Sequence, residues 1–290
     1  MHHFKEWKKD TRTIRFISGI FSNFKNKNKI NIYNLKMKLL QVSNISLIFG
    51  GIHALSNVNL SIQPGQITSI IGPNGAGKTS LLNCISGFYH PTKGAIRLGD
   101  HDLTNASPHQ ISKLGIARAF QNLELFSNMT VLENLLLARH KNLNYNLFQA
   151  LLYFGKASSV EAENRQFVEK IIDFMELAPY RKKIVGNLGY GIQKRVEVAR
   201  ALTLAPDILL LDEPIAGMNV EEKEDIVRFI IDIKQELKAT IVLVEHDLGV
   251  VMDISDHIYV LDFGELIGDG PPDAVASNPK VIQAYIGDEL

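Results

Sequence analysis

The residues from Gly72 to Thr79 read Gly-Pro-Asn-Gly-Ala-Gly-Lys-Thr, a spacing typical of a phosphate-binding loop. An apolar, β-rich run precedes the loop at 67–71, and a run with helical spacing follows it at 80–86. The glycines let successive backbone amides face one anion, and the following helix adds the positive end of its dipole. The sequence therefore predicts a nucleoside triphosphate site.

Two side chains at the end of this loop carry the expected chemistry. Lys78 is expected to reach the β- and γ-phosphates, and the Thr79 hydroxyl is expected to bind Mg²⁺. The predicted nucleotide contacts are consecutive in the chain: Gly72, Pro73, Asn74, Gly75, Ala76, Gly77, Lys78, Thr79 and Ser80.

A pair of carboxylates follows the apolar run at 208–211. Four apolar residues in a row predict a buried central strand, whose end would deliver both acids beside the phosphate-binding loop. Asp212 is expected to hold Mg²⁺, and Glu213 is expected to act as the general base that polarises the attacking water.

Three further residues stand where they could touch the nucleotide. His246 follows the strand-like run at 240–244, which places an imidazole at the carboxyl edge of the sheet, within reach of a γ-phosphate. Phe49 could stack on adenine or could simply belong to the core. Gln121, taken by itself, is equally compatible with an ordinary solvated loop.

Strand-like and helix-like runs alternate along the chain and predict an α/β fold with a parallel sheet and ligand at the strand ends. Helical runs between about 122 and 187 interrupt the alternation and predict an inserted helical lobe. The expected strands lie at 39–48, 54–63, 95–98, 208–211, 240–244 and 257–268, and the expected helices at 108–116, 130–140, 160–177, 190–204 and 221–237.

The 290 residues include one cysteine, Cys84, which excludes an internal disulfide framework. No apolar run approaches the 18–20 or so residues of a membrane helix, and no secretory signal is recognisable. The net charge of zero hides an asymmetry, because residues 1–38 carry ten basic and two acidic side chains and the remainder carries 21 and 29. We expect a basic arm at 1–38 and a catalytic domain at 39–290.

The arm allows three readings. Apolar residues near 14, 17, 20 and 24 have helical spacing, which is compatible with a basic amphipathic helix on an anionic membrane. Nucleic-acid binding is a second reading. The third is a disordered or mis-assigned leader, with translation starting at Met37.

Residues 39–290 resemble the ATPase subunit of an ABC transporter. The resemblance implies a RecA-like parallel core, an antiparallel β subdomain and a helical lobe, and it identifies Gln121 as the Q-loop residue that also approaches the metal. It further assigns His246 as the switch histidine and Glu213 as the catalytic glutamate. The family's signature segment, which contacts a partner's ATP, corresponds to Leu188, Gly189, Tyr190, Gly191, Ile192 and Gln193.

The chain departs from the family pattern in two places. Gly189 and Ile192 stand where the general signature has Ser and Gln, and the D-loop ends in Asn219 rather than Asp. We therefore expect the site that this chain completes for its partner to be weaker than its own. We also predict that Gly189→Ser and Ile192→Gln are tolerated.

Within the family the chain most resembles the LivG-type ATPase of branched-chain amino acid importers. The matching stretches are 49–51, 116–122, 126–134 and the tail at 278–287, within a C-terminal tail of about 264–290. The resemblance implies ATP and Mg²⁺ as cofactors, a second ABC ATPase (a heterodimer, or a homodimer), two membrane permeases and, indirectly, a substrate-binding protein. It places the chain on the cytoplasmic face of the membrane, powering uptake of branched-chain or other hydrophobic amino acids or related small amides.

Two other functions compete with this one. A soluble ABC ATPase working outside transport is supported only by the basic arm, and we expect no nucleic-acid partner. A weakly hydrolysing regulatory subunit is supported by the altered signature, but Lys78, Asp212, Glu213 and His246 argue against it.

Overall fold

The computed structural model describes residues 38–119, 125–140 and 156–286. The predicted arm, apart from Lys38, lies outside the described residues, as does Gln121. None of the helices within the described ranges is long and apolar enough to cross a membrane.

One sheet is antiparallel, with strand order β2 (Ile52–Ile62), β1 (Leu40–Phe49), β4 (Lys93–Leu98) and β5 (His101–Asp102). Along β1 the buried side chains are Leu40, Val42, Ile45 and Leu47, so this face is turned to the core. Gly50 and Gly51, both with positive φ, form the turn into β2. The two strands that the sequence predicts at 39–48 and 54–63 thus form an antiparallel hairpin.

The second sheet has the order β10 (Glu265–Gly270), β9 (His257–Asp262), β3 (Ile67–Ile71), β8 (Thr240–Val244), β7 (Ile208–Asp212) and β6 (Ile116–Ala119). All neighbours are parallel except β10, which is antiparallel to β9. Every residue of β3, β7 and β8 is buried. Burial on both faces explains why β7 and β8 are almost continuously apolar in sequence, while β3 also buries the small polar residues Thr68 and Ser69.

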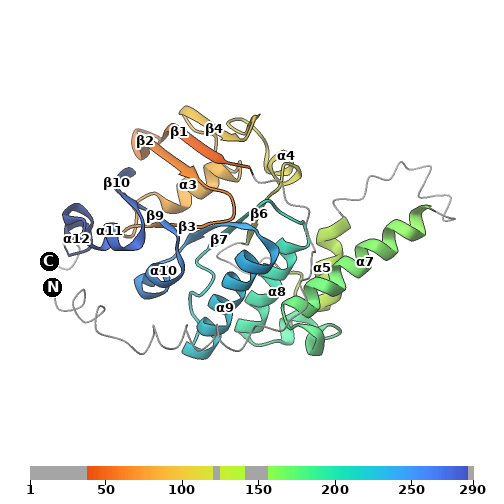
Figure 1. Ribbon diagram of the computed structural model, residues 1–290. Helices are drawn as coiled ribbons and strands as arrows, with labels where there is room; N and C mark the ends of the chain where they lie inside the picture. The colour runs from red at the N-terminus through yellow and green to blue at the C-terminus, as the bar shows by residue number, and fades with distance from the viewer. Residues whose placement is uncertain (1–37, 120–124, 141–155, 287–290) are drawn as a thin grey trace.

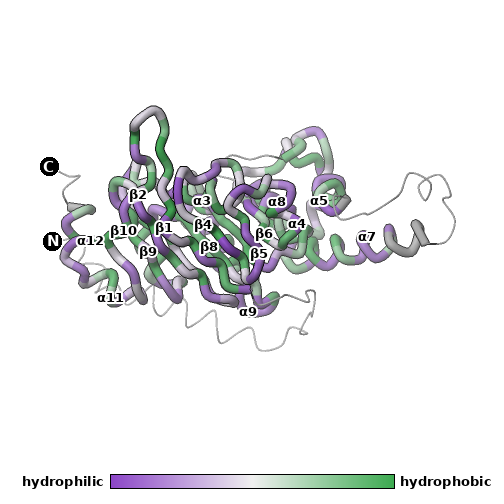
Figure 2. The backbone as a smooth tube through the Cα atoms, turned by 90° about the horizontal axis from the view of Figure 1, so that it is seen from above, coloured by the Kyte–Doolittle hydropathy of each residue, from purple (hydrophilic) through white to green (hydrophobic). Residues whose placement is uncertain are grey.

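Helix α3 (Lys78–Ile85) packs between the two sheets through Leu81, Leu82 and Ile85 (Figure 1). On the opposite face of the parallel sheet lie α8 (Tyr190–Leu202) and α9 (Val220–Leu237). The buried residues of α9 recur at helical spacing, at Ile226, Phe229, Ile230, Ile233 and Leu237. Hydrophobic segments gather around α3 and β8 in Figure 2.

The predicted helical lobe contains α5 (Val131–His140), α7 (Lys156–Phe174) and two 3₁₀ turns, Ala178–Tyr180 and Val185–Asn187. The apolar residues of α5 and α7 join the same core as α8, and α7 projects from the body of the molecule in both views (Figures 1 and 2). Thr130 and Glu133 form a capping box at the start of α5, with bonds in both directions.

Two predictions of elements need correction. The helix expected over 108–116 is α4 (Pro108–Lys113), because Gly115 has φ 104° and turns the chain into the edge strand β6, which the sequence reading missed. Three helices after β8 were not anticipated either: α10 (Leu248–Ile254), α11 (Pro272–Ala276) and α12 (Pro279–Ile286).

Candidate nucleotide-binding and catalytic site

The phosphate-binding loop connects the buried end of β3 to the first turn of α3. Gly72 has φ 150°, and a Cβ there would lie 2.0 Å from the Leu261 carbonyl oxygen. Gly77 is the left-handed N-cap of α3 with φ 99°. A Cβ on Gly75 would meet no atom within 4 Å, so the loop is open on that side. Gly72 therefore allows the loop to pack closely against Leu261, and Gly75 leaves the other side of the loop accessible.

Lys78 is almost completely buried in the first turn of α3. Its ammonium donates to the carbonyl oxygens of Gly72 at 2.7 Å and Pro73 at 2.8 Å, and so closes the loop on itself. Burial lowers the pKa of the lysine, while the nearby carboxylates of Glu213 and Asp212 act in the opposite direction. A buried ammonium is a strong partner for a phosphate because little water screens it.

Asp212, the last residue of β7, is 2% exposed and forms an ion pair of 2.7 Å with Arg118 of β6. Arg118 also donates to Asn83 (2.7 Å) and Ser86 (3.2 Å) of α3. One guanidinium therefore ties the edge strand, the central strand and the helix of the phosphate-binding loop together. Sequence reasoning missed this role, because the three partners are far apart in the chain.

Glu213 follows in a left-handed backbone conformation (φ 50°), which is costly for a residue with a side chain. Its amide donates to the Val244 carbonyl at 2.9 Å, which fixes the turn after the strand. The carboxylate is hydrogen-bonded to His246 Nε2 at 2.8 Å. The structure thus brings the predicted base and the predicted switch histidine into direct contact.

Glu245, next to His246, is a second carboxylate that sequence reasoning overlooked. It is 4% exposed and accepts from the amides of Ile215 (3.0 Å) and His246 (3.1 Å). Burial raises its pKa against the opposing effect of these two bonds. Glu245 therefore holds together the two loops that carry Glu213 and His246. The signal available in the sequence was an acidic residue that directly follows an apolar strand.

Lys78, Glu213 and His246 line a cleft of about 540 Å³, whereas Asp212, Arg118 and Glu245 lie outside its lining. Its floor is the phosphate-binding loop, and Glu213 and His246 face it from the ends of the neighbouring strands. The remaining lining residues come from β2 and from the turn after β9: Ile52, His53, Ala54 and Phe263. The volume lies in the range usual for small-molecule sites.

The oxygen atoms expected for Mg²⁺ were tested against the structure. Asp212 Oδ1 is buried and has no hydrogen-bond partner among the described residues, although Oδ2 is held by Arg118. Thr79 lies on the exposed face of the first turn of α3, at the cleft. Carboxylate and hydroxyl oxygens are ligands that Mg²⁺ accepts, and an orphaned buried oxygen fits such a role.

Phe49 lies outside the set of residues that line the cleft. Its ring packs edge-on against Tyr89, with centroids 5.1 Å apart and an interplanar angle of 74°. The prediction that Phe49 stacks on adenine remains a prediction. Gln121 lies outside the described residues.

The predicted signature segment begins α8, at an edge away from the cleft. Gly189 is the N-cap without a side-chain hydrogen bond, and a Cβ there would meet nothing within 4 Å. Gln193 turns back to donate to the Leu188 carbonyl at 2.7 Å. Ile192 is partly buried against the core. An isoleucine here therefore packs, whereas a glutamine would bring an amide to that apolar contact.

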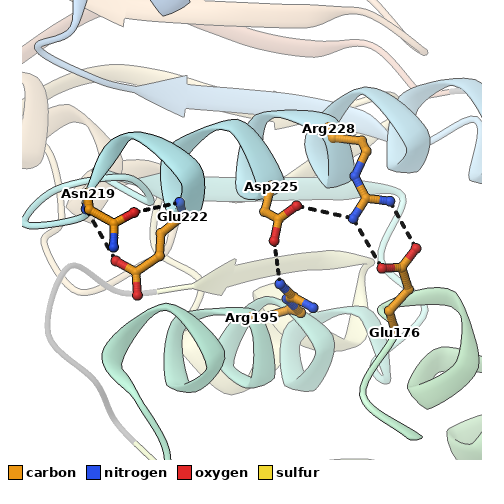
Figure 3. A network of polar contacts seen from close by, with 6 residues as sticks. All are labelled: Glu176, Arg195, Asn219, Glu222, Asp225 and Arg228. Atoms are coloured by element: carbon orange, nitrogen blue, oxygen red, sulfur yellow. Dashed lines mark hydrogen bonds and ion pairs between the residues drawn. The ribbon is translucent and has the colours of Figure 1, made fainter. Parts of the chain in front are cut away.

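The D-loop ends in a capping box at the start of α9 (Figure 3). The Asn219 side chain accepts from the Glu222 amide at 2.9 Å, and the Glu222 carboxylate accepts from the Asn219 amide at 3.2 Å. Asparagine caps a helix as well as aspartate does, so this departure preserves the local structure. A Cβ on Gly191 would lie 2.7 Å from Glu222 Oε1, so the signature packs closely against this box.

A polar network joins α8 and α9 beyond the box (Figure 3). Arg195 pairs with Asp225 at 2.9 Å. Arg228 forms a two-point contact with Glu176, at 2.9 and 3.1 Å, and also approaches Asp225. These contacts fix the two helices that carry the signature and the D-loop.

Comparison with family models gives two matches. Residues 55–216 match the model described as ABC transporter. Residues 265–290 match the model described as Branched-chain amino acid ATP-binding cassette transporter.

The chain is similar to the high-affinity branched-chain amino acid transport ATP-binding proteins BraF of Pseudomonas aeruginosa and LivG of Escherichia coli K12. It is 41% identical to each, over 86% and 88% of this chain and 98% and 100% of the relatives. Among solved structures it is similar to the ADP conformation of MJ1267, an ATP-binding cassette of an ABC transporter, with TM-score 0.75 and 34% identity, over 87% of this chain and 100% of that one.

Proposed function

The chain belongs to the ABC transporter ATP-binding family, and we propose that its ATPase activity drives uptake of branched-chain amino acids through separate membrane permeases. The observation that carries the proposal is the contact between Glu213 and His246 at 2.8 Å, in a cleft floored by the phosphate-binding loop. The proposal is supported by this contact, because a base at Glu213 would stand beside the terminal phosphate of a nucleotide bound on the loop.

Branched-chain amino acids are proposed as the substrate class on two grounds. The tail matches the model of branched-chain amino acid cassettes, and BraF and LivG carry that substrate class in their names. The selection itself would belong to permeases and a binding protein, because the described cleft is built around the phosphate-binding loop and is proposed to hold the nucleotide.

Hydrolysis is proposed to proceed by in-line attack of water on the terminal phosphate. Glu213 takes the proton of the attacking water, and its carboxylate is held for this by His246. The left-handed backbone at Glu213 and the buried support from Glu245 fix the base before substrate arrives.

The developing charge on the phosphate is stabilised by Lys78 and by the amides of the loop. Lys78 would exchange its bonds to the Gly72 and Pro73 carbonyls for phosphate oxygens, which requires little movement because both sets of partners lie at the loop. Mg²⁺, held by Thr79, Asp212 and Gln121, would supply further neutralisation of the phosphate charge.

We place the protein in a head-to-tail dimer with a second ABC ATPase, the cleft of each facing the signature of the other. Support comes from their separation within this chain: the cleft lies at β3 and β7, whereas Gly189 stands at the start of α8 with no side-chain cap. Exposed backbone amides at a helix N-terminus are suited to a phosphate supplied by another subunit. Closure would assemble the site and hydrolysis would reopen it.

The permeases are proposed to dock, at the cytoplasmic face of the membrane, in an apolar groove of about 490 Å³ that is lined by residues of α4, β6, α5 and the end of α8. Phe88, Phe126 and Leu137 line it, and all three are exposed. Arg118, which binds Asp212, also lines the groove. A permease segment bound in this groove could contact Arg118, which pairs with Asp212 beside the nucleotide site.

Gentle purification of a C-terminally tagged protein from native membranes, followed by mass spectrometry, tests the assembly. Two permeases and a second ATPase should accompany it. Ribosomal or nucleic-acid-bound material without permeases would overturn the importer. The same spectra show whether peptides preceding Met37 are present.

A further inference from the structure

The last described helix, α12, is fixed to the edge strand β10 at its first turn. The Asn278 side-chain oxygen accepts from the Lys280 amide at 3.0 Å, and the Asn278 side-chain amide donates to the Ile267 carbonyl at 3.4 Å. A Cβ on Gly268 would lie 2.7 Å from a methyl group of Val281, so β10 has a glycine where the helix packs most closely. These contacts set the position of the whole helix.

Tyr285 extends this packing from β10 toward the phosphate-binding loop. It lies four residues after Val281, so both side chains are on one face of α12. The partly buried Tyr285 packs against a small core cluster that contains Val281 and Ile71. Ile71 is the last residue of β3 and directly precedes Gly72, the first residue of the loop. The C-terminal helix therefore packs against the strand that leads into the loop.

The phenol of Tyr285 makes a polar contact with the loop itself. Burial raises the pKa of the phenol to about 12, and a hydrogen bond from the Gly72 backbone acts against this rise. The phenol is therefore uncharged at physiological pH, and its oxygen serves the Gly72 amide as a neutral acceptor. This contact joins the last described helix to the first residue of the loop.

Gly72 connects this contact to the lysine that is expected to bind phosphate. The Gly72 carbonyl accepts from the Lys78 ammonium at 2.7 Å. On its other side Gly72 is confined by β9, because a Cβ there would lie 2.0 Å from the Leu261 carbonyl oxygen. One glycine thus has Tyr285 at its amide and Lys78 at its carbonyl.

We propose that Tyr285 is a positioning residue for the phosphate-binding loop: its ring and its phenol oxygen hold Gly72, and Gly72 in turn holds Lys78. Tyr285 lies outside the lining of the cleft, so it would act on the nucleotide only through the loop. The inference rests on the proposed binding of ATP at this cleft. It gives the C-terminal tail, which matches the model of branched-chain amino acid cassettes, a role in nucleotide affinity.

The test compares Tyr285→Phe with the matched control Tyr259→Phe in the full chain. Tyr285→Phe removes the phenol oxygen at Gly72 and keeps the ring. The control removes a phenol that is bonded to the backbone of Ser61, at 3.0 and 3.1 Å, and that links β9 to β2 instead of to the loop. Hydrogen exchange of the Gly72 amide is measured without nucleotide, and isothermal titration measures binding of ATP and of inorganic tripolyphosphate.

We expect Tyr285→Phe to speed exchange at Gly72 and to weaken binding of both probes by about threefold to tenfold, the usual strength of one hydrogen bond. The two losses should be equal, because the loop holds the phosphates, which both probes share. Tyr259→Phe should bind both probes like the wild type and leave exchange at Gly72 unchanged, although it too loses a buried polar contact.

Unchanged affinity in Tyr285→Phe would overturn the proposal. An equal loss of affinity in Tyr259→Phe would also overturn it, because the effect would then be one of general stability. A loss for ATP that tripolyphosphate does not share would place the effect at the base instead of the loop, and would refute the proposal as well. If the wild-type chain bound neither probe, the proposed function would fail, whereas exchange at Gly72 would still report whether Tyr285 holds the loop.

Discussion

The nucleotide cleft and the signature edge are built in opposite ways. At and beside the cleft, Asp212 and Glu213 stand at the end of the fully buried strand β7 and Lys78 stands in the first turn of α3, and each is held by short polar contacts. At the signature edge, Gly189 offers no side chain, and the polar contacts nearby are the bond from Gln193 to the Leu188 carbonyl and the capping box of α9. The side chains that are held in place before a ligand binds are therefore those expected to serve the nucleotide on this chain's own loop.

This difference implies a division of labour in the proposed dimer. On this proposal the site on this chain's own loop would contain a base, a lysine and oxygen atoms for the metal, whereas the site it completes for its partner would depend mainly on backbone amides. A serine hydroxyl at position 189 would add one hydrogen bond to a phosphate, a contribution of about 1.5–3 kcal/mol for a charged partner.

The largest effect is expected from Glu213→Gln. The substitution keeps the shape and the contact with His246 but removes the base, so turnover should fall at least about 100-fold. ATP affinity should remain, because Lys78 and the loop are untouched. Phosphate release under single-turnover conditions, read beside ATP titration, measures both. Normal turnover in this variant would remove Glu213 from the role of base.

Arg118→Met should be the most destabilising change at the cleft. Removing one partner of a buried ion pair lowers the free energy of unfolding by about 3–5 kcal/mol. In this variant the buried Asp212 carboxylate would lose its ion pair with Arg118. Urea denaturation gives the loss.

The matched control is Arg228→Met, whose partner Glu176 is 41% exposed, so its loss should be near 1 kcal/mol. Turnover should fall in the Arg118 variant alone. Equal losses of stability in the two variants would contradict the contrast between cleft and edge.

Gly191→Ala should have a moderate effect at the signature edge. Its Cβ would displace the Glu222 carboxylate that caps α9, at a cost of about 1 kcal/mol. The midpoint of chemical denaturation measures this. Should the variant be as stable as the wild type, the packing of the signature against the capping box would be unimportant.

Gly189→Ser should have the smallest effect on stability, a gain of a few tenths of a kcal/mol, because the site is open and serine caps a helix. Turnover of the assembled complex should rise. Ile192→Gln, which the sequence also predicts to be tolerated, should instead lose stability through its contact with the core. A severe loss of turnover in Gly189→Ser would indicate that this glycine is matched to its partner.

The sequence predicts the features that depend on neighbouring residues. The phosphate-binding loop, the strand before Asp212 and the hairpin at Gly50 and Gly51 are local patterns with one structural solution, and the structure has them. Their arrangement at one sheet edge follows from parallel topology.

The rest depends on contacts between distant segments. Arg118 links β6, β7 and α3 through its hydrogen bonds to Asn83, Ser86 and Asp212. The residues next to position 118 in the sequence do not indicate these distant partners. The edge strand β6 is short and contains an arginine, so its pattern reads as the end of a helix.

Uptake of labelled leucine tests the central claim most directly. Cells producing the permeases with either the wild-type chain or Glu213→Gln would be compared at equal levels of assembled complex. The account predicts ATP-dependent uptake with the wild type and none with the variant. Equal uptake by both would contradict it, because transport would then proceed without hydrolysis by this subunit.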